Sequence, residues 1–222
     1  MRPLVLTVRA LPALLILPLL VSCAGVLPGS RESAPLTYLL APDLPSAGRK
    51  STWRSGTAPT LLISRPEEAA GFGTRRMAYM GEDYRLDYFA DHEWVDSPAA
   101  MLGPLLVRSL RASEAFGAVT EDARGIRADL RLDTVVEALY QDFRRQPSVA
   151  RVELRVRLVA PEAGRILTSS VFVEIEPAPS DDPYGGVVAI NRALTRLLPQ
   201  IADFAAQGAA ESAPDTGHRA AP

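Results

Sequence analysis

The chain of 222 residues contains little cysteine, histidine or lysine, and each shortage excludes a class of chemistry. Cys23 is the single cysteine, so neither an intramolecular disulfide nor a cysteine-cluster metal site can form. The two histidines, His92 and His218, lie far apart and leave little material for a zinc or iron centre, so we predict no metal and no cofactor. The net charge of −2 provides no basic surface for nucleic acid, which we do not expect as a partner.

Lysine is nearly absent, since Lys50 is the only one among 24 basic residues and the others are arginines. Arginine can bind phosphate or carboxylate groups in a bidentate manner. A GC-rich genome would produce the same composition without any functional meaning. We favour this second interpretation because the arginines are spread along the chain and usually lie near an acidic residue.

Catalytic motifs are also missing. The sequence contains no nucleophile elbow, Walker loop, dinucleotide-binding fingerprint or His-Glu-x-x-His motif. Asp91-His92-Glu93 has catalytic residue types, but successive strand residues point to opposite faces, so the three cannot converge on one substrate atom. Gly71-Phe72-Gly73 lacks the rest of a phosphate-binding loop and is better interpreted as a turn. We therefore expect no catalytic residues and no enzymatic activity.

Residues 1–22 have the layout of a bacterial secretory signal peptide. Arg2 and Arg9 precede an uncharged apolar run over residues 10–20, and small residues follow it. This run is too short to span a bilayer, which requires about 20 residues. If it were extended to Ser30 it would be long enough, but it would then include several prolines and glycines, so a retained membrane anchor is the second interpretation.

Cys23 lies directly after this signal. Leu20-Val21-Ser22-Cys23 resembles the lipobox of bacterial lipoprotein precursors, in which the cysteine thiol receives a diacylglycerol and the chain is cut just before it. We therefore predict that Cys23 is lipidated; the alternative is that it is merely a small residue in an apolar segment. Acylation at two or more positions gives stable membrane anchoring. In lipoproteins an Asp after the cysteine often signals inner-membrane retention, so Ala24 favours the outer membrane, with the domain facing the periplasm.

The mature chain is expected to have three parts. Residues 23–36 are small, polar or proline and predict a flexible tether. Residues 37–206 contain the apolar periodicity of a folded domain. Residues 207–222 lack such periodicity and predict a disordered tail.

Alternating apolar and charged residues predict a meander of three long strands, over residues 130–140, 152–158 and 166–175. In the first strand the apolar positions include Ala138 and Tyr140, and in the third they are Val171, Val173 and Ile175. One side of this sheet is thus expected to be apolar, and the other a solvated ladder of arginine and glutamate. Docking of a partner by this ladder is the second interpretation. Shorter strands are expected over four segments: 37–40, 60–64, 75–79 and 84–89.

Two helices complete the predicted fold. Ser97-Pro98 combines a capping side chain with proline at the first helical position. Apolar residues recur at helical spacing from Val187 to residue 206, after a loop over residues 177–186. Two helices can cover the apolar side of a sheet, so we predict an α+β domain in which an antiparallel or mixed sheet is covered on one face by two helices.

Aromatic residues concentrate between Phe72 and Trp94. Most are expected in the core. Any that are exposed would be candidates for contact with a protein or a lipid, since aromatic side chains anchor interfaces.

The order of these features is similar to that of a known family. The lipobox and tether are followed by Tyr38-Leu39-Leu40-Ala41-Pro42, by Arg65-Pro66, by a hairpin that contains Arg76-Met77 and Tyr84-Arg85-Leu86, by Trp94, and by a helix from Ser97. From about Tyr38 to Phe204 the chain resembles the ABC-type transport auxiliary lipoproteins, the PqiC-like family. The paired tyrosines usual in the first strand are Thr37-Tyr38 here, and the loop before Thr60 is longer.

The resemblance implies a fold like the N-terminal domain of TolB and a non-catalytic role in lipid or apolar solute transport. The implied partners are a periplasmic MCE-domain protein and its ABC permease and ATPase, and members of the family can form homo-oligomeric rings. Two other classes remain open. One is a general cell-envelope assembly or docking lipoprotein without a transport role, and the other is an enzyme of unknown type.

Overall fold

The computed structural model describes residues 34–44, 58–122, 124–125 and 127–212. The predicted signal peptide, Cys23 and most of the tether that follows it lie outside the described residues, as do residues 213–222. The predictions made for these segments therefore stay predictions.

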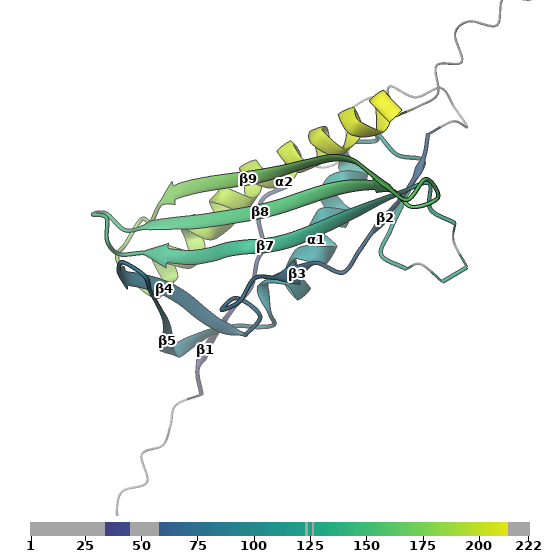
Figure 1. The fold of residues 1–222 in the computed structure, drawn as a ribbon. Coiled ribbons are helices and arrows are strands. Elements are labelled where there is room, and N and C mark those ends of the chain that lie inside the picture. Colours follow the sequence, from purple (N-terminus) through teal and green to yellow (C-terminus); the bar gives the residue numbers. More distant parts are fainter. Residues whose placement is uncertain (1–33, 45–57, 123, 126, 213–222) are drawn as a thin grey trace, which may run out of the picture. The chain divides into compact units, whose positions relative to one another are not determined.

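Three long antiparallel strands form the largest part of the sheet, as the alternation predicted (Figure 1). They are β7 (Leu130–Asp142), β8 (Val149–Ala160) and β9 (Arg165–Pro177). In the described part of the chain β9 pairs with β8 alone, so it is an edge strand over its whole length.

The remaining strands make the sheet mixed. An antiparallel hairpin of β4 (Arg76–Glu82) and β5 (Arg85–Trp94) joins β7 through parallel pairing of β4, and β1 (Leu36–Tyr38) extends the sheet parallel to β5. Three short strands complete it in parallel pairings that the sequence pattern did not predict. They are β2 (Thr60–Ile63) and β3 (Glu67–Glu68), which pair with β7, and β6 (Ala118–Thr120), which pairs with β2.

Helices α1 (Pro98–Ala112) and α2 (Pro183–Ser212) lie on the same face of the sheet, which confirms the predicted α+β class (Figure 1). The Ser97 side chain caps α1 by accepting a hydrogen bond from the backbone N–H of Ala100. Helix α2 begins inside the segment expected to be a loop and continues through residues 207–212, which were expected to belong to the disordered tail. The continuation is stabilised because Gly208 and Ala209 are buried, and Gly208 approaches β9 so closely that a Cβ there would lie 2.7 Å from a Thr168 methyl group.

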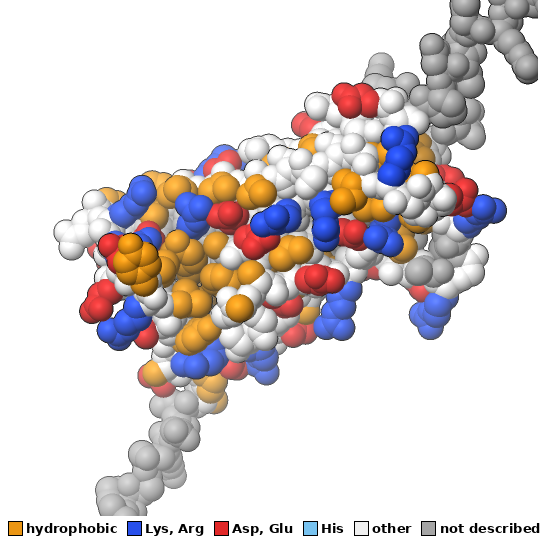
Figure 2. Space-filling view, viewed as in Figure 1, with side chains coloured by type: hydrophobic (Ala, Val, Ile, Leu, Met, Phe, Trp, Pro, Cys, Tyr) orange, Lys and Arg blue, Asp and Glu red, His pale blue; other side chains and the backbone are white. Residues whose placement is uncertain are grey.

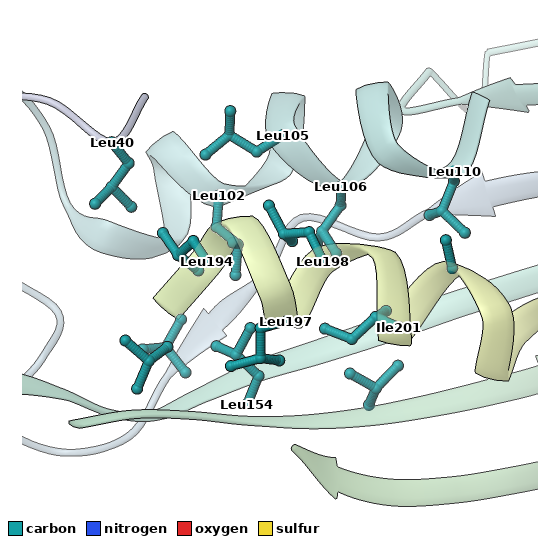
Figure 3. Close-up of a cluster of buried hydrophobic side chains, with 14 of the residues drawn as sticks. Leu40, Leu102, Leu105, Leu106, Leu110, Leu154, Leu194, Leu197, Leu198 and Ile201 are labelled. Carbon is teal, nitrogen blue, oxygen red and sulfur yellow. The ribbon is translucent and has the colours of Figure 1, made fainter. Parts of the chain in front are cut away.

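Leucine is the most frequent residue in the core between the helices and the sheet (Figure 3). Helix α2 presents Leu194, Leu197 and Leu198 to the interior, and all three are fully buried. Leu106 of α1 and Leu154 of β8 are also inaccessible to solvent. Burial of each such side chain contributes about 1.5–3 kcal/mol, so this layer holds both helices on the sheet.

The predicted face of Ala138 and Tyr140 is wrong because β7 contains a bulge. Val136 lies opposite Leu154, whereas Ala138 lies opposite Glu153, so Glu137 is an extra residue in the ladder. The bulge reverses the alternation, so Ala138 and Tyr140 face away from the helices.

The prediction for β9 is also wrong. Val171, Val173 and Ile175 were expected on the apolar face of the sheet, but they lie on the outer face and are 46%, 44% and 40% exposed. The intervening Phe172 packs against the helices, where its ring meets that of Phe204 with centroids 5.4 Å apart. On β9 the more regular hydrophobic row therefore faces outward.

Candidate docking surfaces

The outer face of β8 and β9 carries both apolar and charged side chains (Figure 2). We call Val171, Val173 and Ile175 the β9 stripe. Each lies opposite a charged residue of β8: Val171 opposite Arg155, Val173 opposite Glu153, and Ile175 opposite Arg151. An apolar row bordered by charges is the usual composition of a protein interface, with a dehydrated centre and a polar rim.

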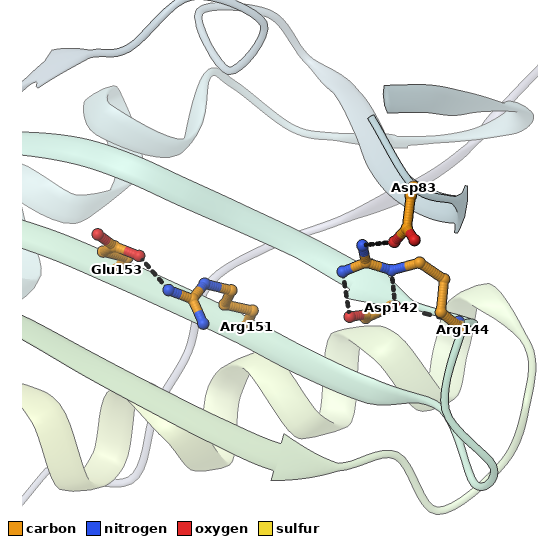
Figure 4. Close-up of polar contacts among 5 residues, drawn as sticks. All are labelled: Asp83, Asp142, Arg144, Arg151 and Glu153. Atoms are coloured by element: carbon orange, nitrogen blue, oxygen red, sulfur yellow. Dashed lines mark hydrogen bonds and ion pairs between the residues drawn. The ribbon is translucent and has the colours of Figure 1, made fainter. Parts of the chain in front are cut away.

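The charges on this face are paired with one another. Arg151 Nη2 lies 2.5 Å from Glu153 Oε2 (Figure 4). Arg155 Nε lies 2.6 Å from Glu137 Oε1. Exposed pairs of this kind contribute only about 0–1 kcal/mol each to stability. They hold the long side chains in place beside the β9 stripe, and this agrees with the predicted solvated ladder, except that the ladder also contains apolar residues.

The outer face is covered only at its other end. Phe72, from the segment between β3 and β4, packs with Ala78, Ala138 and Tyr140 in a second small hydrophobic cluster. The Tyr88 hydroxyl donates a 2.8 Å hydrogen bond to the Gly71 carbonyl, and Gly71 adopts φ +93°, which favours glycine. Gly71-Phe72-Gly73 is thus part of a turn that closes the sheet over β4 and β7, and it leaves β8 and β9 open.

A three-residue ionic cluster fixes the turn between β7 and β8 to the β4–β5 hairpin (Figure 4). Arg144 donates to Asp142 through Nε (2.8 Å) and Nη2 (2.7 Å), and to Asp83 through Nη1 (2.7 Å). The hydrogen bonds from Arg144 lower the pKa of Asp142, which outweighs the opposing effect of its burial. The same hydrogen bonds raise the pKa of Arg144. All three side chains are occupied with one another, so the cluster is structural.

Asp91, His92 and Glu93 do not form a catalytic group. The Tyr38 hydroxyl lies 3.0 Å from His92 Nδ1, within hydrogen-bonding distance, and the two rings are stacked. Glu93 instead pairs with Arg75, whose Nη2 is 2.6 Å from Glu93 Oε1, while Asp91 is exposed. Neighbouring side chains therefore meet different partners, as the strand geometry predicted.

A row of aromatic rings lies on the helix side of β1, β4 and β5. Successive rings are in contact from Tyr184 of α2 to Tyr38, His92, Phe89, Tyr79 and Phe143. We call these six residues the aromatic strip. Tyr184 is 62% exposed and the other five are partly exposed. Of the aromatic residues between positions 72 and 94, Trp94 and Phe72 are buried as expected, whereas Tyr84 at the β4–β5 turn is fully exposed.

The described residues contain neither a cluster that could hold a metal ion nor a helix that could span a membrane. No group of three or more His, Cys, Asp or Glu among them could hold a metal ion. No helix in the described ranges is long and apolar enough to cross a membrane.

The described domain is thus a mixed sheet with two helices on one face and with part of its other face open to solvent. The model of one family, described as the ABC-type transport auxiliary lipoprotein component, matches residues 38–202. The chain belongs to this family, as its sequence features had indicated.

Solved structures share the fold. Protein XCC0632 from Xanthomonas campestris is 20% identical, with a TM-score of 0.68, over 79% of this chain and 97% of that protein. The hypothetical protein CT253 from Chlamydia trachomatis is 7% identical, with a TM-score of 0.52, over 70% of this chain and 99% of its own. A search of curated protein sequences finds no match.

Proposed function

We propose that this protein is a non-catalytic accessory subunit of an MCE/ABC-type transport system for lipids or other apolar solutes. It is anchored by a lipidated Cys23, on the outer membrane rather than the inner, and its domain faces the periplasm. The observation that carries the proposal is the family match over residues 38–202, because that family is described as an auxiliary component of ABC-type transport.

In this proposal the outer face of β8 and β9 docks the periplasmic MCE component. The β9 stripe supports this assignment because it exposes three β-branched side chains in one row of β9, which in the described chain pairs with β8 alone. Burial of such a row on association removes apolar surface from water, which favours binding. Assembly of several copies into a ring around the MCE component belongs to the same proposal.

Crosslinking in cells followed by mass spectrometry tests the function. A C-terminally tagged full-length chain is compared with the same chain carrying Cys23→Ser. We expect an MCE-domain protein and its ABC permease and ATPase among the crosslinked proteins, and less of them with Cys23→Ser. Recovery of only assembly or wall-binding proteins of the envelope would contradict the transport role and support the general docking lipoprotein.

A further inference from the structure

The exposed hydrophobic residues of the described chain fall into two groups and one isolated tyrosine. Four of them belong to β9, and Tyr84 stands alone at the β4–β5 turn. The other four surround the first strand of the domain, and we call them the β1 rim. They are Leu36 (59% exposed), Leu39 (55%), Val95 (53%) and Tyr184 (62%).

Contacts on β1 bring these four residues together from three parts of the chain. Leu36 pairs with His92 in the parallel ladder, and the N–H of Val95 donates a 2.7 Å hydrogen bond to the Tyr38 carbonyl. The Tyr184 ring lies 6.4 Å from that of Tyr38. Behind the rim, the aromatic strip continues along the helix side of the sheet. The result is an apolar and aromatic border at a sheet edge that nothing in the described chain covers.

We propose that the β1 rim rests on the surface of the lipid bilayer and orients the domain on it. This inference relies on the proposed anchor at Cys23. Residues 24–35 alone separate Cys23 from β1, and even fully extended a segment of that length reaches at most about 45 Å. The anchor therefore keeps the β1 end of the sheet within about that distance of the bilayer.

The chemistry of the rim suits the boundary between headgroups and acyl chains. Tyrosine is enriched at that boundary because its ring is apolar and its hydroxyl remains hydrated. Leucine and valine can enter the acyl region beside it. The residues next to the rim and the strip in the sequence include three acidic ones, Asp91, Asp96 and Asp182. Electrostatic attraction to anionic lipid therefore contributes little, and binding of the rim to the bilayer should not weaken as the salt concentration rises.

The same geometry separates the two apolar surfaces. The β1 rim lies on the strand next to the C-terminal end of β5, whereas the β9 stripe lies at the opposite edge of the sheet. A domain that rests on its β1 edge keeps the outer face of β8 and β9 turned away from the lipid, where a periplasmic partner can reach it.

Fluorescence quenching on vesicles tests this orientation. Because Cys23 is the only thiol, the mature chain can be coupled at that position to a maleimide lipid in phosphatidylethanolamine and phosphatidylglycerol vesicles that contain a shallow doxyl quencher. Tryptophan is introduced by Tyr184→Trp in the rim, or by Tyr84→Trp as a matched control at the other end of β5. Emission of the unsubstituted protein, from Trp53 and Trp94, is subtracted.

We expect roughly twofold quenching of Tyr184→Trp, since interfacial side chains lie about 5–10 Å deep, and little quenching of Tyr84→Trp. Adding Leu36→Ser and Leu39→Ser should abolish the difference, whereas Val171→Thr and Val173→Thr should preserve it. Equal quenching at both positions, or none at either, would overturn the proposal. So would self-association of the uncoupled protein that Leu36→Ser abolishes, because the rim would then bind a second copy.

Chemical coupling makes this result independent of lipidation in the cell. If Cys23 is not acylated in vivo, the proposed function fails while the quenching difference persists. If the rim does not touch lipid, the quenching difference disappears while crosslinking to transport subunits persists.

Discussion

Deletion of Glu137 should leave the protein folded, although it removes a residue from the middle of a central strand. Val136 lies opposite Leu154 and Ala138 opposite Glu153, so removal of Glu137 closes the ladder into continuous register. Val136 and Leu139 still face the helices. The deletion also removes the partly exposed Glu137–Arg155 ion pair, which is worth about 0–1 kcal/mol. Since the local twist is reduced as well, we expect a total cost of about 1.5 kcal/mol or less.

Deletion of Val135, two positions earlier, is the matched control. The least costly way to restore continuous pairing is to lose the bulge. Glu137 then takes the place of Val136 opposite Leu154, and the Val136 side chain turns to the outer face. Val136 is fully buried, so its exposure costs about 1.5–3 kcal/mol. Burial of the Glu137 carboxyl costs at least about 2 kcal/mol more. The sum, about 4 kcal/mol, is a large share of the 5–15 kcal/mol that stabilises a typical protein.

Guanidinium unfolding of the mature chain with Cys23→Ser, followed by far-ultraviolet circular dichroism, measures both costs. We expect Glu137 deletion to shift the midpoint slightly and Val135 deletion to shift it severely or prevent folding. Equal losses, or a larger loss for Glu137, would refute the reasoning, because the bulge itself rather than the alternation it sets would then stabilise the sheet.

Three further predictions concern packing and charge. Gly186→Ala should cost about 1–3 kcal/mol, because its Cβ would collide with the buried Gln141 amide, and a double variant with Gln141→Ala should recover part of the loss in thermal unfolding. Phe172→Ala should lower the free energy of unfolding by about 2 kcal/mol or more, and Val173→Ala by less than about 0.5 kcal/mol. This order is the reverse of the one that the apolar alternation along β9 suggests. Because the pKa of Asp142 is lowered in the folded protein, its ionised form stabilises the fold above the ordinary aspartate value of about 4, and this contribution is lost as the pH falls below it. Asp142→Asn should therefore lower the melting temperature at neutral pH and flatten its decrease in acid.

The fold class could be predicted because its signals are local. Alternation in β7, β8 and β9, a Ser-Pro cap at α1 and apolar spacing in α2 all act over a few residues. The parallel pairings of β2, β3 and β6 could not be predicted, since strands of two to four residues acquire their pairing from neighbours that are distant in the sequence.

The candidate surfaces were harder to predict because each depends on which face a residue occupies. The bulge at Glu137 places Tyr140 on the face of the sheet opposite to the one predicted, and no local residue preference predicts the bulge. On β9 the outward row, from Val171 to Ile175, is more regular than the inward one, which includes Phe172 and Glu174. Glu174 can lie on the helix side because it forms an ion pair with Arg196 of α2. The alternation along β9 alone does not predict this partner. An apolar row that faces solvent is the signal that marks a docking surface.

Site-specific photocrosslinking in cells tests the central claim most directly. A photoreactive phenylalanine analogue is placed at Val173 on the β9 stripe, or at Tyr184 in the β1 rim, of the otherwise unchanged full-length chain. The account predicts that position 173 crosslinks to an MCE-domain protein or another subunit of the transport system, and that position 184 does so much less. Crosslinking of position 184 but not 173 to those subunits, or of neither to any of them, would contradict the account.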